Sequence, residues 1–423
     1  MRGAVRAAGH AYSVVLGGTR WYVLAFALVN ASFLFTERRW VGERGWTLDW
    51  AAGGTFISGP LLAGLTCYLA YPLLNPVARR AFGLSRPGTA LRAVGVALAR
   101  GVLVGWIGHG LTILGAVLAT ELTRPTDTYH LGFAAVCLVP LTFYAAIGVL
   151  AATVLGRTVA AVTATLASLV VGYLGLFGTL PNVLAVGGHV GSLVGYRYDT
   201  SVVLLSQSVV GAWTILVAAV TVAVVHGHRL VRPTLAVCGA AAVLATVAAL
   251  SAGVSMEGRV VLAADPPPRV CDEGSPRVCL NAGHTRSLST VARDLRTAHD
   301  ALAASGADLP EVYAERPPER GLERGVGVID LNPGSLNAAR FDAYDYAFAV
   351  AVPGDCQAYR AERPPEELLL VQQYVAAWVL RELTGEELLG PGTLDPITDE
   401  WMRLAVDDLR GCDVSPSTLA PIS

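Results

Sequence analysis

The sequence predicts a polytopic α-helical membrane bundle of about seven transmembrane helices, followed by a small α+β extracytoplasmic domain. Three observations lead to this fold class. The mean hydropathy is +0.51 and only 15% of the residues are charged, whereas soluble domains carry about 25% charged residues. Residues 1–256 contain 16 arginines and 6 acidic residues, but residues 257–423 contain 15 arginines and 27 acidic residues. The apolar residues, finally, are grouped into long stretches in the first part of the chain.

Seven stretches are apolar over roughly the 20 residues that a helix needs to cross a bilayer core. They are residues 21–36, 51–73, 98–120, 131–154, 158–180, 202–226 and 233–255. The first has the shortest apolar centre. Residues 131–180 are too long for one span, and the break at Gly156, Arg157 and Thr158 predicts a hairpin of two helices there. Residues 20–256 are therefore predicted to form the transmembrane bundle.

The arginines predict the orientation of the bundle, because cytoplasmic loops of membrane proteins are enriched in basic residues. If the N-terminus is cytoplasmic, the inner segments hold arginines and no acidic residue: Arg2, Arg6, Arg20, Arg79, Arg80, Arg86, Arg92, Arg157, Arg229 and Arg232. The outer loops then hold a balanced mixture: Glu37, Arg38, Arg39, Glu43, Arg44, Asp49, Glu121, Arg124, Asp127, Arg197 and Asp199. We expect a multi-pass plasma-membrane protein with a cytoplasmic N-terminus. Seven spans place the C-terminal half outside, whereas a re-entrant segment at 158–180 would leave it in the cytoplasm.

Residues 1–19 precede the first span and are expected on the cytoplasmic side. Two readings remain open for them: an amphipathic helix on the membrane surface, or a basic tail without regular structure. They lack a long apolar centre and a cleavage site, so we do not expect a signal peptide.

Two polar residues within the predicted spans are candidates for function. His109 is the one ionisable side chain well inside a span, and such residues commonly face a bundle interior or a transport path. The alternative is a neutral histidine that is hydrogen-bonded to a neighbouring helix. Gln207, near the start of 202–226, can form hydrogen bonds across helices. Gly172, Gly175 and Gly178 lie roughly on one face, which predicts close helix packing there.

The composition argues against several enzyme classes. The chain contains no lysine, so it lacks the side chain with which a P-loop contacts phosphates and the amine of a Schiff-base enzyme. The segment AAWVLREL has no histidine pair for a zinc protease, and Ser335 lies outside a nucleophile-elbow pattern. We therefore predict no catalytic, cofactor-binding or metal-binding residues, no enzymatic activity and no nucleic-acid partner.

Residues 257–423 are long enough for one compact domain outside the membrane. Short apolar runs predict strands at 259–263, 276–281, 326–331 and 346–352. Apolar residues at helical spacing predict three amphipathic helices at 284–306, 366–383 and 399–412. Strands and helices in this order give an α+β domain.

The seven cysteines divide between the two parts of the chain. Cys67, Cys137 and Cys238 lie in apolar spans and are expected to behave as small hydrophobic residues. The other four lie in the predicted outer domain, where an even number predicts two disulfides: Cys271, Cys279, Cys356 and Cys412. The sequence DEGSP can turn two short strands back on each other, so a Cys271–Cys279 bridge fits best, and Cys356–Cys412 would follow. A metal site or a reactive thiol is the alternative.

The stretch ERGWTLDWAAGGTFISGPLLAGLTCYLAYPLLNPVARRAFG resembles a group of actinobacterial ABC-transporter permease-like membrane proteins. The matching residues are Trp46, Trp50, Ser58, Gly59, Pro60, Leu61, Ala63, Gly64, Arg79 and Arg80. The tail adds a cysteine hairpin followed by a histidine, with Cys271, Val278, Cys279 and His284, as in the extracytoplasmic domains of that group. In the order of spans and domains, the resemblance covers most of the chain. At the level of individual residues, it is limited to the patches named above.

The resemblance implies a permease subunit of an ABC-type export system that relies on a separate ATP-binding subunit. The cytoplasmic contact with that subunit would involve Arg79, Arg80, Arg86 and Arg92. Besides the lipid bilayer, a second copy of the chain in a homodimer is a further candidate partner. Exporter permeases of this type ordinarily have six spans with both ends inside, and the predicted seven spans depart from this. The alternative function is that of a non-transporting membrane-anchored protein whose outer domain binds a ligand or a cell-envelope partner.

Overall fold

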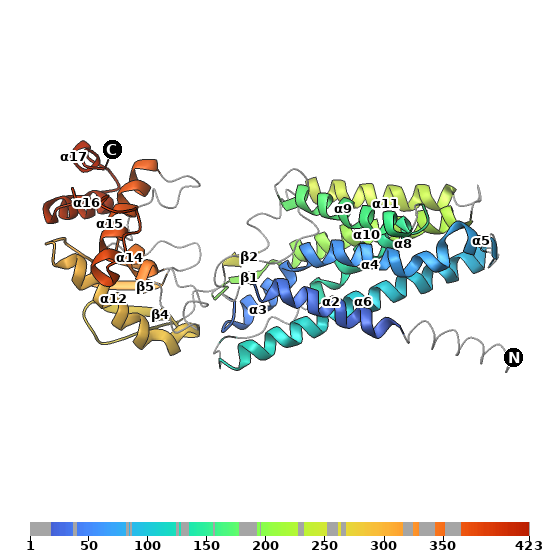
Figure 1. Ribbon diagram of the computed structural model, residues 1–423, viewed down its shortest axis with the longest axis horizontal. Helices are drawn as coiled ribbons and strands as arrows, with labels where there is room; N and C mark the ends of the chain where they lie inside the picture. The colour runs from blue at the N-terminus through green and yellow to red at the C-terminus, as the bar shows by residue number, and fades with distance from the viewer. Residues whose placement is uncertain are drawn as a thin grey trace.

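The chain forms a long helical bundle with a smaller outer domain beyond one of its ends (Figure 1). The computed structural model describes residues 18–36, 40–81, 84, 87–123, 127, 135–154, 157–176, 193–194, 196–226, 232–251, 261–263, 268–315, 325–329, 343–351 and 365–422. The predicted N-terminal segment 1–19 therefore lies almost entirely outside the described residues.

The bundle consists of helices that coincide with the predicted apolar stretches. Their bounds are α2 (Thr19–Leu34), α4 (Thr55–Leu74), α6 (Pro87–Glu121), α8 (Leu138–Ala151), α9 (Arg157–Leu176), α10 (Thr200–His226) and α11 (Arg232–Ser251). The helices run side by side along the bundle (Figure 1). The short α5 (Pro76–Ala81) lies at one end, and α3 (Arg44–Gly53) with the strands β1 (Tyr196–Tyr198) and β2 (Val261–Ala263) lies at the other.

Three helices of the described chain are long and apolar enough to cross a membrane: Thr55–Ala81, Gly88–Glu121 and Thr200–His226. The apolar helices Leu138–Ala151, Arg157–Tyr173 and Leu235–Ala249 are shorter. Many large apolar side chains on the bundle are exposed, among them Leu28, Leu118, Val159 and Leu244. Such a surface is compatible with a lipid environment.

The bundle differs from the prediction in two places. The stretch predicted to span from residue 51 is divided at Gly54, because α3 ends at Gly53 and α4 begins at Thr55. The stretch predicted to begin at residue 98 starts earlier, since α6 begins at Pro87. Arg92 therefore lies on the first turns of a helix and not in a loop.

Helix α4 lies at the centre of the bundle and contacts α6, α8 and α9. Glycines bring these helices close together, as small residues commonly do in membrane bundles. A Cβ atom at Gly59 would overlap the ring of Tyr144 on α8, and a Cβ atom at Gly64 would overlap Thr165 on α9. On the opposite side of the α4–α8 contact, a Cβ atom at Gly148 would overlap the carbonyl of Ala63. The segment that carries the permease resemblance is thus the most closely packed helix of the bundle.

The outer domain contains a four-stranded sheet in the order β3-β4-β5-β6. The strands are β3 (Arg269–Cys271), β4 (Arg277–Asn281), β5 (Val312–Glu315) and β6 (Val326–Ile329). Strand β3 pairs with β4 in antiparallel orientation, whereas β4, β5 and β6 are parallel. The 3₁₀ helix η2 (Ala282–Ser287) and α12 (Leu288–Ala303) connect β4 to β5. The carboxyl ends of the three parallel strands therefore meet at one edge.

Helices cover the sheet and form the core of the outer domain. They are α12, α14 (Ala343–Ala351), α15 (Glu366–Thr384), α16 (Asp399–Gly411) and the short α17 (Pro416–Leu419). The apolar stripe of α12, with Val291, Leu295 and Leu302, is fully buried, as its helical spacing predicted. The strand predicted at 346–352 is wrong, because Ala343–Ala351 is helical and packs against α15. Strand β5 was not predicted.

Candidate functional site

The outer domain meets the bundle at a junction that is built from three segments of the bundle half. Strand β1 pairs with β2, which lies between α11 and the outer domain, in antiparallel register. Tyr198 of β1 donates a hydrogen bond to Asp49 of α3. Burial, together with the charge and hydrogen bond of Asp49, raises the pKa of Tyr198 above its usual range. The contact continues into the outer domain, since Gly283 of η2 lies beside Val194.

Two carboxylates enclose a buried histidine at this junction. The Nδ1 atom of His284 lies 2.8 Å from Oε1 of Glu315, and its Nε2 atom lies 3.8 Å from Oε2 of Glu43. The side chains of His284, Glu315 and Glu43 are only 5%, 6% and 2% exposed. Glu315 belongs to the outer domain and Glu43 to the bundle, so the histidine bridges the two parts of the chain.

Local structure fixes both partners of the histidine. Strand β4 ends at Asn281 and η2 begins directly after it, which places His284 beyond the carboxyl end of that strand. Because β5 is the parallel neighbour of β4 and ends at Glu315, the carboxylate reaches the same edge. Its Oε2 atom accepts the backbone N–H of Asn281 at 2.8 Å. On the bundle side, Glu43 precedes α3 and its Oε1 atom accepts the backbone N–H of Leu193 at 2.5 Å.

The electrostatic balance at His284 favours the charged imidazolium. Burial alone would lower the pKa of His284, because a buried charge loses its hydration. The hydrogen bonds and negative charges of Glu315 and Glu43 act in the opposite direction and raise the pKa to about 10. His284 therefore carries a proton at neutral pH, and Nδ1 donates to Glu315 while the charged ring presents Nε2 to Glu43 at 3.8 Å, beyond hydrogen-bond distance.

Helix α3 connects this histidine site to the outer end of the bundle. Arg44 binds Glu121 at the end of α6 with its Nε and Nη2 atoms, at 2.7 and 3.0 Å, and the backbone carbonyl of Asp127 at 2.6 Å. The hydroxyls of Thr47 and Thr120 lie 2.6 Å apart. These contacts hold α3, and with it Glu43, against α6.

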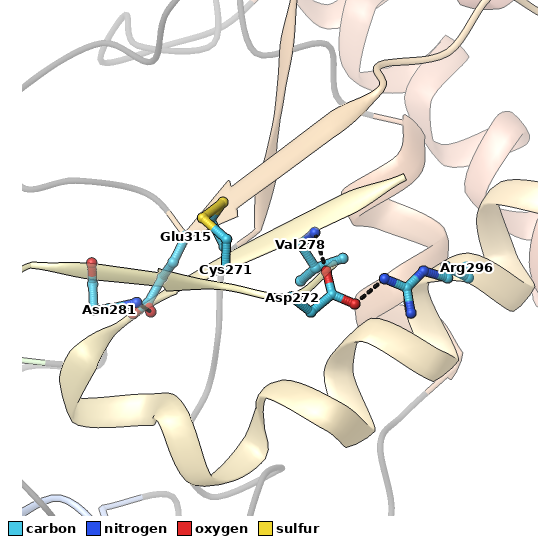
Figure 2. Close-up of a disulfide and its surroundings, with 7 residues drawn as sticks. Cys271, Asp272, Val278, Asn281, Arg296 and Glu315 are labelled. Carbon is cyan, nitrogen blue, oxygen red and sulfur yellow. Dashed lines mark hydrogen bonds and ion pairs between the residues drawn. A yellow bond between two sulfur atoms is a disulfide. The ribbon is translucent and has the colours of Figure 1, made fainter. Parts of the chain in front are cut away.

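The cysteine hairpin lies in the same sheet, one strand away from Glu315 (Figure 2). Cys271 and Cys279 stand opposite each other in the β3–β4 register and form a disulfide, the pairing that the sequence favoured. Asp272 accepts the backbone N–H of Val278 at 2.8 Å and pairs with Arg296 of α12. Partial burial opposes the charge of Asp272, but these two contacts outweigh it and lower its pKa. The hairpin is thus tied to α12, and the arrangement is structural.

The other cysteines agree with their expected surroundings where the structure describes them. Cys67, Cys137 and Cys238 are free thiols within bundle helices or next to one. Cys412 is disulfide-bonded. Cys356 lies outside the described residues, so its pairing with Cys412 stays a prediction.

The two polar candidates of the helical bundle, His109 and Gln207, lie on α6 and α10 and are not part of the junction. His109 on α6 accepts a hydrogen bond at Nδ1 from the side-chain amide of Asn30 on α2, at 2.8 Å. This is the interhelical contact that the sequence offered as the alternative to a transport role. Gln207 lies on α10, and neither polar atom of its amide has a hydrogen-bond partner among the described residues. No contact between these two residues is observed in the described chain.

Two of the arginines predicted to face the cytoplasm, Arg79 and Arg80, lie on α5 at the far end of the bundle. Arg79 donates from Nε to the carbonyl of Leu74 at the end of α4, and from its guanidinium to Thr153 just after α8 and Val224 near the end of α10. A cation at helix C-termini is favourable because unpaired carbonyls point toward it. Arg80 and Arg92 are exposed, and Arg86 lies outside the described residues.

The sequence reasoning counted Glu43 and Asp49 only as charges of an outer loop. In the structure they are 1% and 0% exposed and belong to the junction. The available signal was that Glu43 lies between Trp40 and Trp46, and Asp49 between Trp46 and Trp50, since tryptophan side chains are on average highly buried. His284 was noted in the sequence, but its partners come from distant segments and could not be read from spacing.

Within the part of the chain that the structure describes, no group of three or more His, Cys, Asp or Glu side chains is arranged to hold a metal ion. Comparison with protein-family models, with curated proteins and with solved structures gives no match for this chain.

Proposed function

We propose that the chain is a multi-pass membrane protein of seven spans whose extracytoplasmic domain works while docked on the outer end of the bundle. In this proposal the outer domain binds a ligand or a cell-envelope partner, and the bundle is the membrane anchor that holds the domain in place. The observation that carries the proposal is the buried Glu43–His284–Glu315 contact, because it joins the bundle to the outer domain through charged groups that neither part could leave buried alone.

The arrangement of charges and cysteines supports this orientation. The exposed Arg80 and Arg92 lie toward the α5 end of the bundle, and the disulfide-bonded domain lies beyond the α3 end. Cytoplasmic loops are rich in arginine, and disulfides persist on the oxidising side of the membrane. An odd number of spans is needed to place these two features on opposite sides.

The packing of the bundle favours a role as a membrane anchor over a role in transport. Helices α8 and α9 approach α4 at Gly59, Gly64 and Gly148, where a Cβ atom would overlap a neighbouring residue. The buried Asn30 and His109 are paired with each other and not aligned with further ionisable groups in the described spans. Helices that are in such close contact leave little space for a substrate between them.

A permease subunit is the second candidate function. The exposed side chains of Arg80 and Arg92 favour it, because they offer a positively charged surface to a cytoplasmic partner, as the resemblance to ABC-type permeases implies. In that case an ATP-binding subunit would dock at the α5 end.

Purification of the full chain from its native membrane, followed by measurement of bound ATPase activity, separates the two functions. If the bundle is only an anchor, the protein purifies without a nucleotide-binding subunit. The Arg80→Glu/Arg92→Glu double variant then shows the same absence of bound ATPase activity as the wild type. A stoichiometric ATPase that is lost in this double variant would establish the permease role instead. Arg403→Glu, an exposed arginine of the outer domain, is the matched control and should retain any partner.

A further inference from the structure

The contact between Glu43 and His284 joins two parts of the molecule that are otherwise folded around separate cores. We propose that Glu43 and His284 form an ionic latch that holds the outer domain on the bundle, and that the latch opens when His284 loses its proton. The inference rests on the proposed function only in assigning this contact to the outer side of the membrane.

Each partner of the latch is fixed to its own part of the chain. Glu43 is held by the bundle half, because its Oε1 atom accepts the N–H of Leu193 and its backbone carbonyl accepts the N–H of Thr47 at 2.9 Å. His284 is held by the outer domain through Glu315. The two side chains therefore meet only when the two parts are docked.

The geometry makes the contact depend on one proton. With Nδ1 hydrogen-bonded to Glu315, the second ring nitrogen, Nε2, faces Glu43 at 3.8 Å and has no hydrogen-bond partner among the described residues. A protonated Nε2 presents an N–H with positive charge to the Glu43 carboxylate. A deprotonated Nε2 presents a lone pair to the same carboxylate, and the attraction is replaced by repulsion.

Among the described residues, the charged groups that act on His284 are two carboxylates, Glu315 from β5 and Glu43 from the segment before α3. The charged side chains of the neighbouring elements are paired elsewhere or exposed to solvent. Arg44 binds Glu121, Arg296 binds Asp272, and Arg293 binds Asp294, whereas Arg269, Arg277 and Arg286 are exposed.

The direction of the pH dependence follows from the raised pKa of His284, which is about 10 in the docked structure against an ordinary 6.5. Because Glu315 belongs to the same domain as His284, only the part of this rise that comes from Glu43 depends on docking, and through that part the docked state binds the proton more tightly. The attraction between Glu43 and His284 is therefore present at neutral pH and is lost as the pH rises through about 10.

A distance measurement on the full chain in lipid nanodiscs tests the latch. Spin labels are attached at Leu122→Cys, at the outer end of the bundle, and at Ala304→Cys in the outer domain; both positions are exposed. Among the described cysteines outside the disulfides, a Cys238→Ala background leaves the buried Cys67 and Cys137. Pulsed electron resonance then gives the distribution of distances between the two parts at each pH.

The latch predicts one narrow distribution at pH 7 that broadens as the pH passes about 10. Glu43→Gln and His284→Gln should each broaden the distribution at pH 7 and remove its pH dependence. Glu315→Gln should move the broadening to lower pH, because it removes one of the carboxylates that raise the pKa of His284. Asp407→Asn, which removes an exposed ion pair within α16, is the control and should match the wild type.

A narrow, pH-independent distribution in Glu43→Gln would overturn the latch, and so would a wild-type distribution that stays unchanged from pH 7 to 11. Protection of Cys271 and Cys279 from alkylation without reductant verifies that each variant has kept its folded hairpin. The distances report only how the two parts are joined. A result that overturns the latch would therefore not bear on the proposed membrane orientation, which is tested separately.

Discussion

Asn30 and His109 show at the residue scale how the bundle accommodates an ionisable side chain. The amide of Asn30 on α2 donates to Nδ1 of His109 on α6, so the histidine is fixed as the tautomer that carries its proton at Nε2. Thr112, one turn later on α6, reaches the carbonyl of Ala27 at 3.2 Å. These contacts make the α2–α6 interface polar at two adjacent levels.

Asn30→Leu removes the donor and leaves Nδ1 of His109 buried without its partner. Interhelical hydrogen bonds in membranes contribute about 1 kcal/mol and at most about 2, so we expect a destabilisation of about 1–2 kcal/mol. Unfolding in detergent, followed by circular dichroism, measures this change. Ser32→Ala removes an exposed hydroxyl that bonds within its own helix and should have almost no effect; equal losses in both variants would contradict the account.

The sequence predicted some of the functional residues but not their contacts. The sequence indicated that His109 was either a transport residue or an interhelical partner, but it could not name Asn30, because the contact joins residues 79 positions apart. For the same reason Glu43 was counted as a loop charge. Burial of an acidic residue depends on where the chain folds back, and α3 folds back against α6 through Arg44 and Thr47.

Helix α4 is the element on which the bundle is built. It carries Gly59 and Gly64 toward two different neighbours, α8 and α9. Its own Pro60 and Pro72 are tolerated, since packed neighbours support a helix in a membrane. Close packing against its neighbours therefore stabilises α4 more than its own helix propensity does.

Gly64→Val places a side chain where Thr165 and the carbonyl of Ala161 already lie. Overpacking of this kind costs about 1–3 kcal/mol, and we expect a loss of at least that size in the thermal unfolding of the detergent-solubilised protein. Gly110→Val on α6 is the matched control, because a Cβ atom there meets nothing within 4 Å. The packing account fails if the two variants unfold at the same temperature.

Elements with a long, regular pattern were the most predictable from the sequence. The apolar stretches contain the bundle helices, although 51–73 is divided between α3 and α4 and three of the described helices are long and apolar enough to cross a membrane. The apolar stripe at 288–302 predicted α12, and the DEGSP turn predicted the β3–β4 hairpin. The run YAFAVAV was predicted as a strand and is part of α14. A short apolar run does not distinguish a buried strand from a buried helix. Here the run forms a helix that packs against α12 and α15. Strand β5 has the sequence VYAE and contains three apolar residues before Glu315, whereas the equally short β6 lies within the longer run VGVIDL.

At the scale of the whole molecule, the two parts differ in charge and in cysteine state. The bundle half holds the arginine excess and free thiols, and the outer domain holds the acidic excess and the disulfides. The composition predicted this division because each solvent selects its own residue types. It could not predict how the parts are joined, because the junction depends on single residues, Glu43, His284 and Glu315, that the composition does not distinguish.

The central claim is that the α5 end of the bundle is cytoplasmic and the outer domain is outside. Labelling of intact cells with a membrane-impermeant maleimide tests it most directly, with Arg80→Cys and Ala304→Cys as single exposed reporters in the Cys238→Ala background. We predict that Ala304→Cys is labelled in intact cells and that Arg80→Cys is labelled only after permeabilisation. Protection of both reporters in intact cells, or labelling of Arg80→Cys alone, would contradict the seven-span orientation.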